Sequence, residues 1–124
     1  MSDSKEQAWQ RFWEQFDLPV YDESSVPEDA GMPRLTYALS TDSLEGSPTM
    51  PSVSIWWYSN SWEAISRKAQ EIANTIGYGG VSVKYDGGYL WIKRGSPFAQ
   101  RMSDENKAVR RIYFNIEADW LSAD

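Results

Sequence analysis

The first stretch of the chain carries aromatic side chains at helical spacing. Between residues 4 and 17 the apolar positions recur every three or four residues, which places them on one face of a helix. Ser4 and Gln7 match a capping box, and Pro19 should end the helix because the residue before a proline disfavours helical backbone. We expect this face to pack in the core; docking on a partner subunit is the alternative. It consists of Trp9, Phe12, Trp13 and Phe16.

A second amphipathic helix is predicted over residues 60–77. Asn60 or Ser61 should cap it, with Glu63 completing a capping box with Asn60. Arg67 and Glu71 are spaced for an ion pair on its wet face, and Gly77 fits the position after the last helical residue. Its apolar side chains are Trp62, Ile65, Ala69, Ile72, Ala73 and Ile76.

The rest of the chain alternates between apolar and polar positions, as strands do. The alternation predicts strands at 34–41, 52–59, 81–85, 89–94 and 111–120. Asp86-Gly87-Gly88 predicts a tight hairpin between two of them, since glycine reaches positive φ at little cost. Between the predicted elements lie a connector and two loops, at 19–33, 42–51 and 95–106.

These elements indicate an α+β fold in one domain spanning residues 1–124. The expected order is α-β-β-α-β-β-β, with the two helices packed on one face of a mostly antiparallel sheet.

The composition removes several kinds of chemistry. The 124 residues include neither Cys nor His, which excludes disulfides, His- or Cys-based zinc sites, and Ser-His-Asp or Cys-His catalysis. Gly77–Gly80 lacks the spacing of a phosphate-binding loop, and the acidic residues of the connector lack a calcium-binding pattern. We therefore expect no enzyme activity, no cofactor and no metal. No apolar run approaches the roughly 20 residues of a membrane span, so we expect no membrane partner.

Charge is unevenly distributed along the chain. Residues 1–50 hold 10 acidic and 3 basic side chains, whereas residues 51–124 hold 8 and 9. The overall net charge of −6 disfavours sequence-independent DNA binding, and the asymmetry favours contact between the acidic part of one copy and the basic part of another.

Several residues are candidates for an interface. Aromatic side chains at strand positions of the non-core parity, and apolar or basic residues of the 95–106 loop, are typical of binding surfaces. Coverage of these side chains within the monomer is the alternative. If they form an interface, Trp91→Glu should block assembly and leave the monomer folded. The candidates are Trp56, Tyr58, Tyr89, Trp91, Lys93, Phe98, Arg101 and Met102.

Four stretches of the chain resemble a known family. They are WQRFWEQFDLPVYDESSVP (9–27), PRLTYALST (33–41), VKYDGGYLWIKRGSPFAQRMSDEN (83–106) and VRRIYFNIEADWL (109–121), joined by the helix start SNSWEAI (59–65). In this respect the chain resembles the tail-terminator family of long-tailed bacteriophages, also called tail-completion, minor tail or minor capsid proteins. The head-closure or neck proteins are similar in size and context.

The resemblance implies a structural role in the virion. Tail terminators form a homohexameric ring that caps the tail tube, stops its growth and then meets the head connector or neck. DNA passes through the lumen without being read in a sequence-specific way. The protein would be made in the host cytoplasm and remain at the head–tail junction. The length of the 42–51 and 95–106 loops and their Pro and Gly residues, rather than the resemblance, make them the candidates for contact with tube or connector. A carbohydrate- or peptide-binding module, suggested by the seven Trp, and a small enzyme or nucleic-acid-binding protein are the other function classes.

Overall fold

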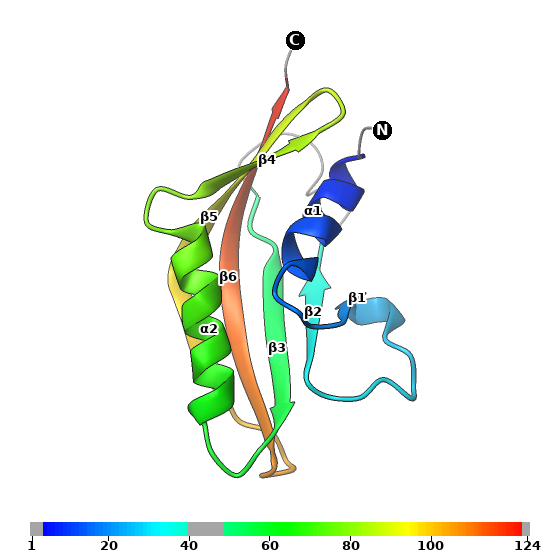
Figure 1. Ribbon diagram of the computed structural model, residues 1–124, viewed down its shortest axis with the longest axis vertical. Helices are drawn as coiled ribbons and strands as arrows, with labels where there is room; N and C mark the ends of the chain where they lie inside the picture. Colours follow the sequence, from blue (N-terminus) through cyan, green and yellow to red (C-terminus); the bar gives the residue numbers. More distant parts are fainter. Residues whose placement is uncertain (1–3, 40–48, 123–124) are drawn as a thin grey trace.

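The computed structural model describes residues 4–39 and 49–122. These residues form two α-helices, one 3-10 helix and a six-stranded sheet, an α+β arrangement as expected (Figure 1). The sheet order is β1-β2-β3-β6-β5-β4, and only the β1–β2 pair is parallel. The elements are α1 (Lys5–Glu14), β1 (Val20–Asp22), η1 (Glu23–Ser25), β2 (Arg34–Ala38), β3 (Ser52–Tyr58), α2 (Glu63–Ile76), β4 (Val81–Tyr85), β5 (Gly88–Met102) and β6 (Val109–Ser122).

The start of α1 is the predicted capping box. The Ser4 hydroxyl accepts a hydrogen bond from the Gln7 main-chain N–H at 3.2 Å, and the Gln7 side chain accepts one from the Ser4 N–H at 2.9 Å. The capping box thus satisfies two N–H groups that the start of the helix leaves without main-chain partners. At the other end, α1 stops at Glu14, and Asp17 adopts a positive φ of 58° and redirects the chain.

The predicted details of α2 are partly wrong. The N-cap position is Trp62, whose side chain makes no cap hydrogen bond, but the Ser61 hydroxyl accepts a hydrogen bond from the Glu63 N–H at 3.3 Å. Arg67 pairs with Glu63 at 2.6 Å rather than with Glu71, since Lys68 occupies Glu71 at 3.0 Å. The other end is as predicted, because Gly77 closes α2 with a φ of 69°.

The β4–β5 hairpin turns at Asp86-Gly87, as the sequence predicts. Tyr85 pairs with Gly88, and Gly87 has a φ of 100°, a conformation in which a side chain would be strained.

Two of the predicted irregular segments contain strands. In the 95–106 segment β5 continues to Met102, so the predicted loop is wrong over residues 95–102. In the 19–33 connector, Val20–Asp22 form β1 beside β2, an element that the predicted order lacks. In the 42–51 segment Thr49 bridges to Ala118, and residues 42–48 lie outside the described residues.

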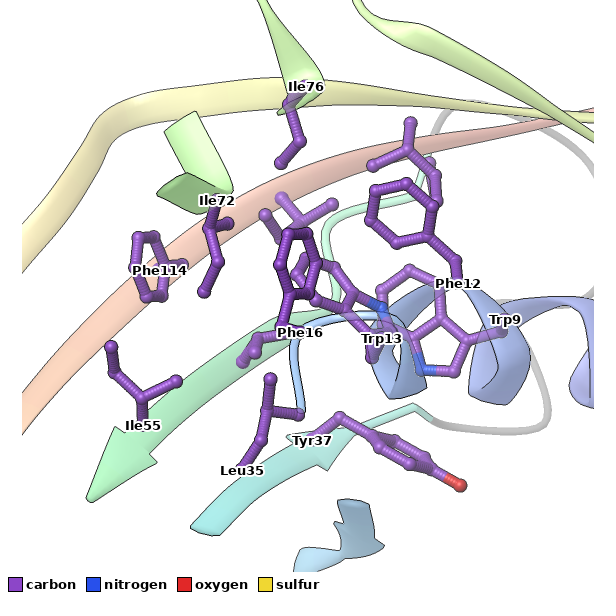
Figure 2. Close-up of a cluster of buried hydrophobic side chains, with 14 of the residues drawn as sticks. Trp9, Phe12, Trp13, Phe16, Leu35, Tyr37, Ile55, Ile72, Ile76 and Phe114 are labelled. Carbon is purple, nitrogen blue, oxygen red and sulfur yellow. The ribbon is translucent and has the colours of Figure 1, made fainter. Parts of the chain in front are cut away.

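One buried cluster holds the helices and the sheet together (Figure 2). The four aromatic residues of the predicted stripe, three in α1 and Phe16 just after it, belong to this cluster, which confirms the core interpretation of the stripe. In Figure 2, Trp13 and Phe16 lie between Ile72 of α2 and the β2 residues Leu35 and Tyr37. The sheet contributes alternate positions, including Leu35, Tyr37, Val53, Ile55, Leu90, Ile92, Ile112, Phe114, Ile116, Ala118 and Trp120.

The sheet curls around α1, so the helices do not form a simple layer on a flat face. The Gln10 side chain donates to the carbonyl of Val20 in β1 at 3.2 Å, and Arg11 donates to that of Lys84 in β4 at 3.4 Å. These two strands are the opposite edges of the sheet. Neighbouring residues of one helix therefore contact both edges, while α2 packs along β3, β5 and β6. The expected arrangement of two helices on one face holds only approximately.

Candidate interaction surface

The sheet has a face that points away from the buried cluster, here called the open face. It is formed by the strand positions that alternate with the core positions. In β6 the buried residues are the even-numbered ones from Ile112 to Trp120, and the odd-numbered ones belong to the open face. The strand register adds Arg34, Thr36, Ser54, Trp56, Tyr58, Tyr89, Trp91, Lys93, Gln100 and Met102.

A row of basic and aromatic side chains crosses the open face. The register aligns Arg34, Trp56, Arg111 and Met102 on four successive strands. The Arg111 guanidinium lies 4.5 Å from the centroid of the Trp56 ring, and the Arg34 guanidinium lies 5.6 Å from it. Both distances are within the range of cation–π attraction.

Trp56 and Arg111 of this row cover the hydroxyl groups of Thr36 and Ser54, which lie next to it on the open face. The Trp56 indole N–H donates to the Thr36 hydroxyl at 2.9 Å, and Arg111 Nε donates to the Ser54 hydroxyl at 3.1 Å. Thr36 and Ser54 are buried as a result. Trp56 is thus engaged within the monomer, and the alternative of internal coverage describes it better than a free aromatic surface.

The other end of the open face holds Tyr89, Trp91 and Lys93. Lys93 Nζ lies 2.6 Å from a Glu117 carboxylate oxygen and 4.1 Å from the Trp91 ring centroid. The Trp91 indole donates to the Gly79 carbonyl at 3.0 Å. Trp91 and Lys93 therefore already have partners within the chain.

Two tyrosines on the open face remain well exposed, and they lie at opposite ends. Tyr58 is 61% exposed and pairs with Val109, whereas Tyr89 is 50% exposed and pairs with Leu121, itself 44% exposed. At about 3.3 Å per residue, the two pairs are roughly 40 Å apart along β6. The five predicted strand residues share one face, but they do not form one continuous patch.

The three predicted residues of the 95–106 segment divide between the faces. Phe98 packs against Phe114 of the core, with ring centroids 5.2 Å apart. The Arg101 guanidinium lies 4.8 Å from the Trp62 ring on the side of α2, and Met102 lies on the open face opposite Arg111. The sequence suggests deleting residues 97–103 to test a loop contact with the tail tube, but the deletion would remove part of a paired strand and would not test a loop.

Arg34, Arg110 and Arg111 are not among the eight interface candidates named from the sequence, although Arg110 and Arg111 belong to a basic cluster that the sequence suggests as a charged interface or rim. Arg110 lies 5.1 Å from the Trp62 ring, so two guanidinium groups contact that indole as two contact Trp56. Arg34 and Arg111 are far from Trp56 in the sequence, and Arg110 is far from Trp62. Strand register brings the first two arginines beside Trp56, and the tertiary fold brings Arg110 beside the start of α2, so no local pattern predicts these contacts.

A groove of about 250 Å³ lies between α2 and the second half of β5, here called the α2 groove. Small and apolar side chains form much of its wall, with Arg101 among the residues that line it. The lining residues are Ser66, Ala69, Gln70, Ala73, Phe98, Ala99, Gln100, Arg101 and Ile112.

Among the described residues, two tyrosines have a shifted pKa. Burial raises the pKa of Tyr37, and the negative charges of Asp22, Glu6 and Glu14 raise it further. Burial also raises the pKa of Tyr85. Within residues 4–39 and 49–122, no group of three or more acidic side chains is arranged to hold a metal ion. Over the same residues, no helix is long and apolar enough to cross a membrane.

Comparison with known proteins gives a similarity of fold. No protein-family model matches the chain, and no curated protein matches it. Among solved structures, a chain from the virion of a native gene transfer agent (GTA) particle is similar, with a TM-score of 0.60 and 16% sequence identity. The match covers 83% of this chain and 78% of that one, so nearly the whole α+β arrangement is shared with a virion component.

Proposed function

We propose that the chain is a structural protein of a phage or phage-derived virion and has no catalytic role. The observation that carries this proposal is the shared fold with a chain of the GTA virion, which extends over 83% of the residues. The resemblance of residues 9–27, 83–106 and 109–121 to phage head–tail proteins points in the same direction.

Within the virion, we propose a tail terminator at the head–tail junction. The chain would form a ring, with six copies as in the family it resembles, that caps the tail tube, and it would then meet the head connector or neck. Exposed Tyr58 and Tyr89 at the two ends of the open face are suited to contacts with other virion proteins, because tyrosine combines a large apolar area with a polar tip. DNA would pass through the lumen without being read.

The proposal is tested by imaging the purified protein alone and with tail tubes of the phage or particle that encodes it. Rings at the end of each tube, cosedimentation with tubes, and a particle mass of six times 14.2 kDa are expected. Binding to isolated heads or connectors but not to tubes would contradict the terminator role and indicate a head-closure or neck protein. Absence of the chain from purified virions would overturn the virion role altogether.

A further inference from the structure

The outer edge of β5 is unpaired over half of its length. β4 pairs with β5 only as far as Ile92, whereas β6 pairs with β5 up to Met102. From Lys93 onward, no other strand of the described residues lies on the side of β5 opposite β6. Ala99–Met102 pair regularly with β6 and are mostly exposed, so they present main-chain N–H and C=O groups to which another strand could bind.

The α2 groove lies beside this unpaired edge. An extended segment added to β5 would place alternate side chains against Ala69, Ala73 and Phe98. An edge strand flanked by a helix with small side chains is an arrangement that accepts a peptide by strand addition. Backbone hydrogen bonds would provide binding, and the groove would select side chains.

The charge of the edge indicates what it binds. Residues 88–103 contain no acidic side chain and carry Lys93, Arg94 and Arg101. The ion pairs of the described residues do not include Arg94 or Arg101. Pairing of this edge with the same edge of a second copy would bring like charges together, which is unfavourable. An acidic segment is therefore the matching occupant.

The chain itself has such a segment at the opposite edge of its sheet. Residues 19–29 include β1 and η1 and carry Asp22, Glu23, Glu28 and Asp29 without any basic residue. Most of this segment is exposed, and β1 is the last strand on its side of the sheet. A short strand of three residues suits the four regular residues at the edge of β5.

We infer that the unpaired edge of β5 and the α2 groove bind the acidic 19–29 segment of a second copy of the chain. This contact joins two different surfaces and leaves one of each free, so it can be repeated around a closed ring. The inference rests on the proposed ring-forming role for the choice of a second copy as occupant.

The experiment compares the self-association of the full-length wild type with two charge variants by sedimentation velocity. Arg101→Glu on one side, and Glu23→Arg with Glu28→Arg on the other, should each weaken association at least about tenfold. An equimolar mixture of the two variants should regain a mixed pair, because the opposite charges are then restored across the contact. Arg67→Glu, the same charge change on the exposed side of α2, should associate like the wild type.

Two further measurements keep the test decisive. If Arg101→Glu lowers the melting temperature, Arg101→Gln replaces it as the variant. Hydrogen exchange of the associated wild type should show slowed amides within residues 99–102. A wild type that stays monomeric at all concentrations, or an Arg101 variant that associates like Arg67→Glu, overturns the inference. Self-association as predicted without any binding to tail tubes would instead contradict the proposed function.

Discussion

The Asn115 side chain donates a hydrogen bond to the main-chain carbonyl of Pro97 at 2.7 Å. Asn115 lies where the register of β5 and β6 is interrupted, since Arg94 pairs with Ile116 and Ala99 pairs with Phe114. One residue of β6 thus faces the four residues 95–98 of β5. The amide of Asn115 holds this bulge against β6 and allows β5 to continue beyond it.

Gly95 makes the bulge possible, and we predict that Gly95→Ala destabilises the fold. A Cβ atom at this position would lie 2.7 Å from the main-chain oxygen of Asn115, so backbone must shift. The expected loss is about 1–3 kcal/mol in the free energy of unfolding, measured by urea denaturation. Gly79→Ala is the control, because a Cβ there has nothing within 4 Å. Equal stability of the two variants would contradict this role of Gly95.

The same bulge shows where the sequence was insufficient. Residues 95–106 contain Gly, Pro and charged residues, which locally favour a loop. Pairing with β6, fourteen residues long, overrides this local preference over residues 95–102. Likewise β1 has only three residues and depends on the neighbouring β2, so no periodicity could reveal it. Both helices, the Asp86-Gly87 turn and the alternation in β6 were predictable because their causes are local.

The candidate site was predictable only in part, for a related reason. Strand parity placed Trp56, Tyr58, Tyr89, Trp91 and Lys93 on one face, as the structure shows. The alternation along a strand predicts on which face a side chain lies, but not which neighbouring side chains cover it. Trp56 is covered by two arginines and Trp91 contacts the Gly79 carbonyl, and these contacts depend on register and on the path of a loop.

The aromatic stripe of α1 should carry much of the stability. Trp13 is fully buried, and its ring centroid lies 4.9 Å from that of Phe12 and 5.5 Å from that of Trp9. Trp13→Ala is expected to cost about 3–5 kcal/mol of unfolding free energy, through lost burial and the cavity that remains. Tyr78→Ala, at an exposed ring that touches Arg94, should cost less than about 1 kcal/mol. Similar losses in the two variants would show that α1 is not a core element.

Stability should fall at alkaline pH because of Tyr37. Its pKa is raised in the folded protein by burial and by nearby carboxylates, so the folded chain keeps a proton that the unfolded chain releases above about pH 10. The folded state then binds more protons, and stability decreases with pH by at most about 1.4 kcal/mol per pH unit for each such group. Urea unfolding between pH 8 and 11 should show a shallower decrease for Tyr37→Phe. Tyr85, whose pKa is also raised by burial, should add to the effect in the double variant. A Tyr37→Phe protein with the wild-type pH dependence would contradict the prediction.

The exposed tyrosines provide a better test of the open face than Trp91. A Trp91→Glu change would disturb the monomer, because the Trp91 indole donates a hydrogen bond to the Gly79 carbonyl. The indole also packs so closely on Gly80 that it fills the space a side chain there would need. Tyr89 is half exposed, so Tyr89→Ser should change the unfolding free energy by less than about 1 kcal/mol. If the open face contacts the tail tube while the edge of β5 joins the copies, Tyr89→Ser should reduce cosedimentation with tubes and leave the particle mass unchanged. Arg101→Glu, by contrast, should lower the particle mass, because it weakens the contact between copies. A Tyr89→Ser protein that binds tubes as well as the wild type would exclude Tyr89 from that contact, and a reduced particle mass would place it between the copies instead.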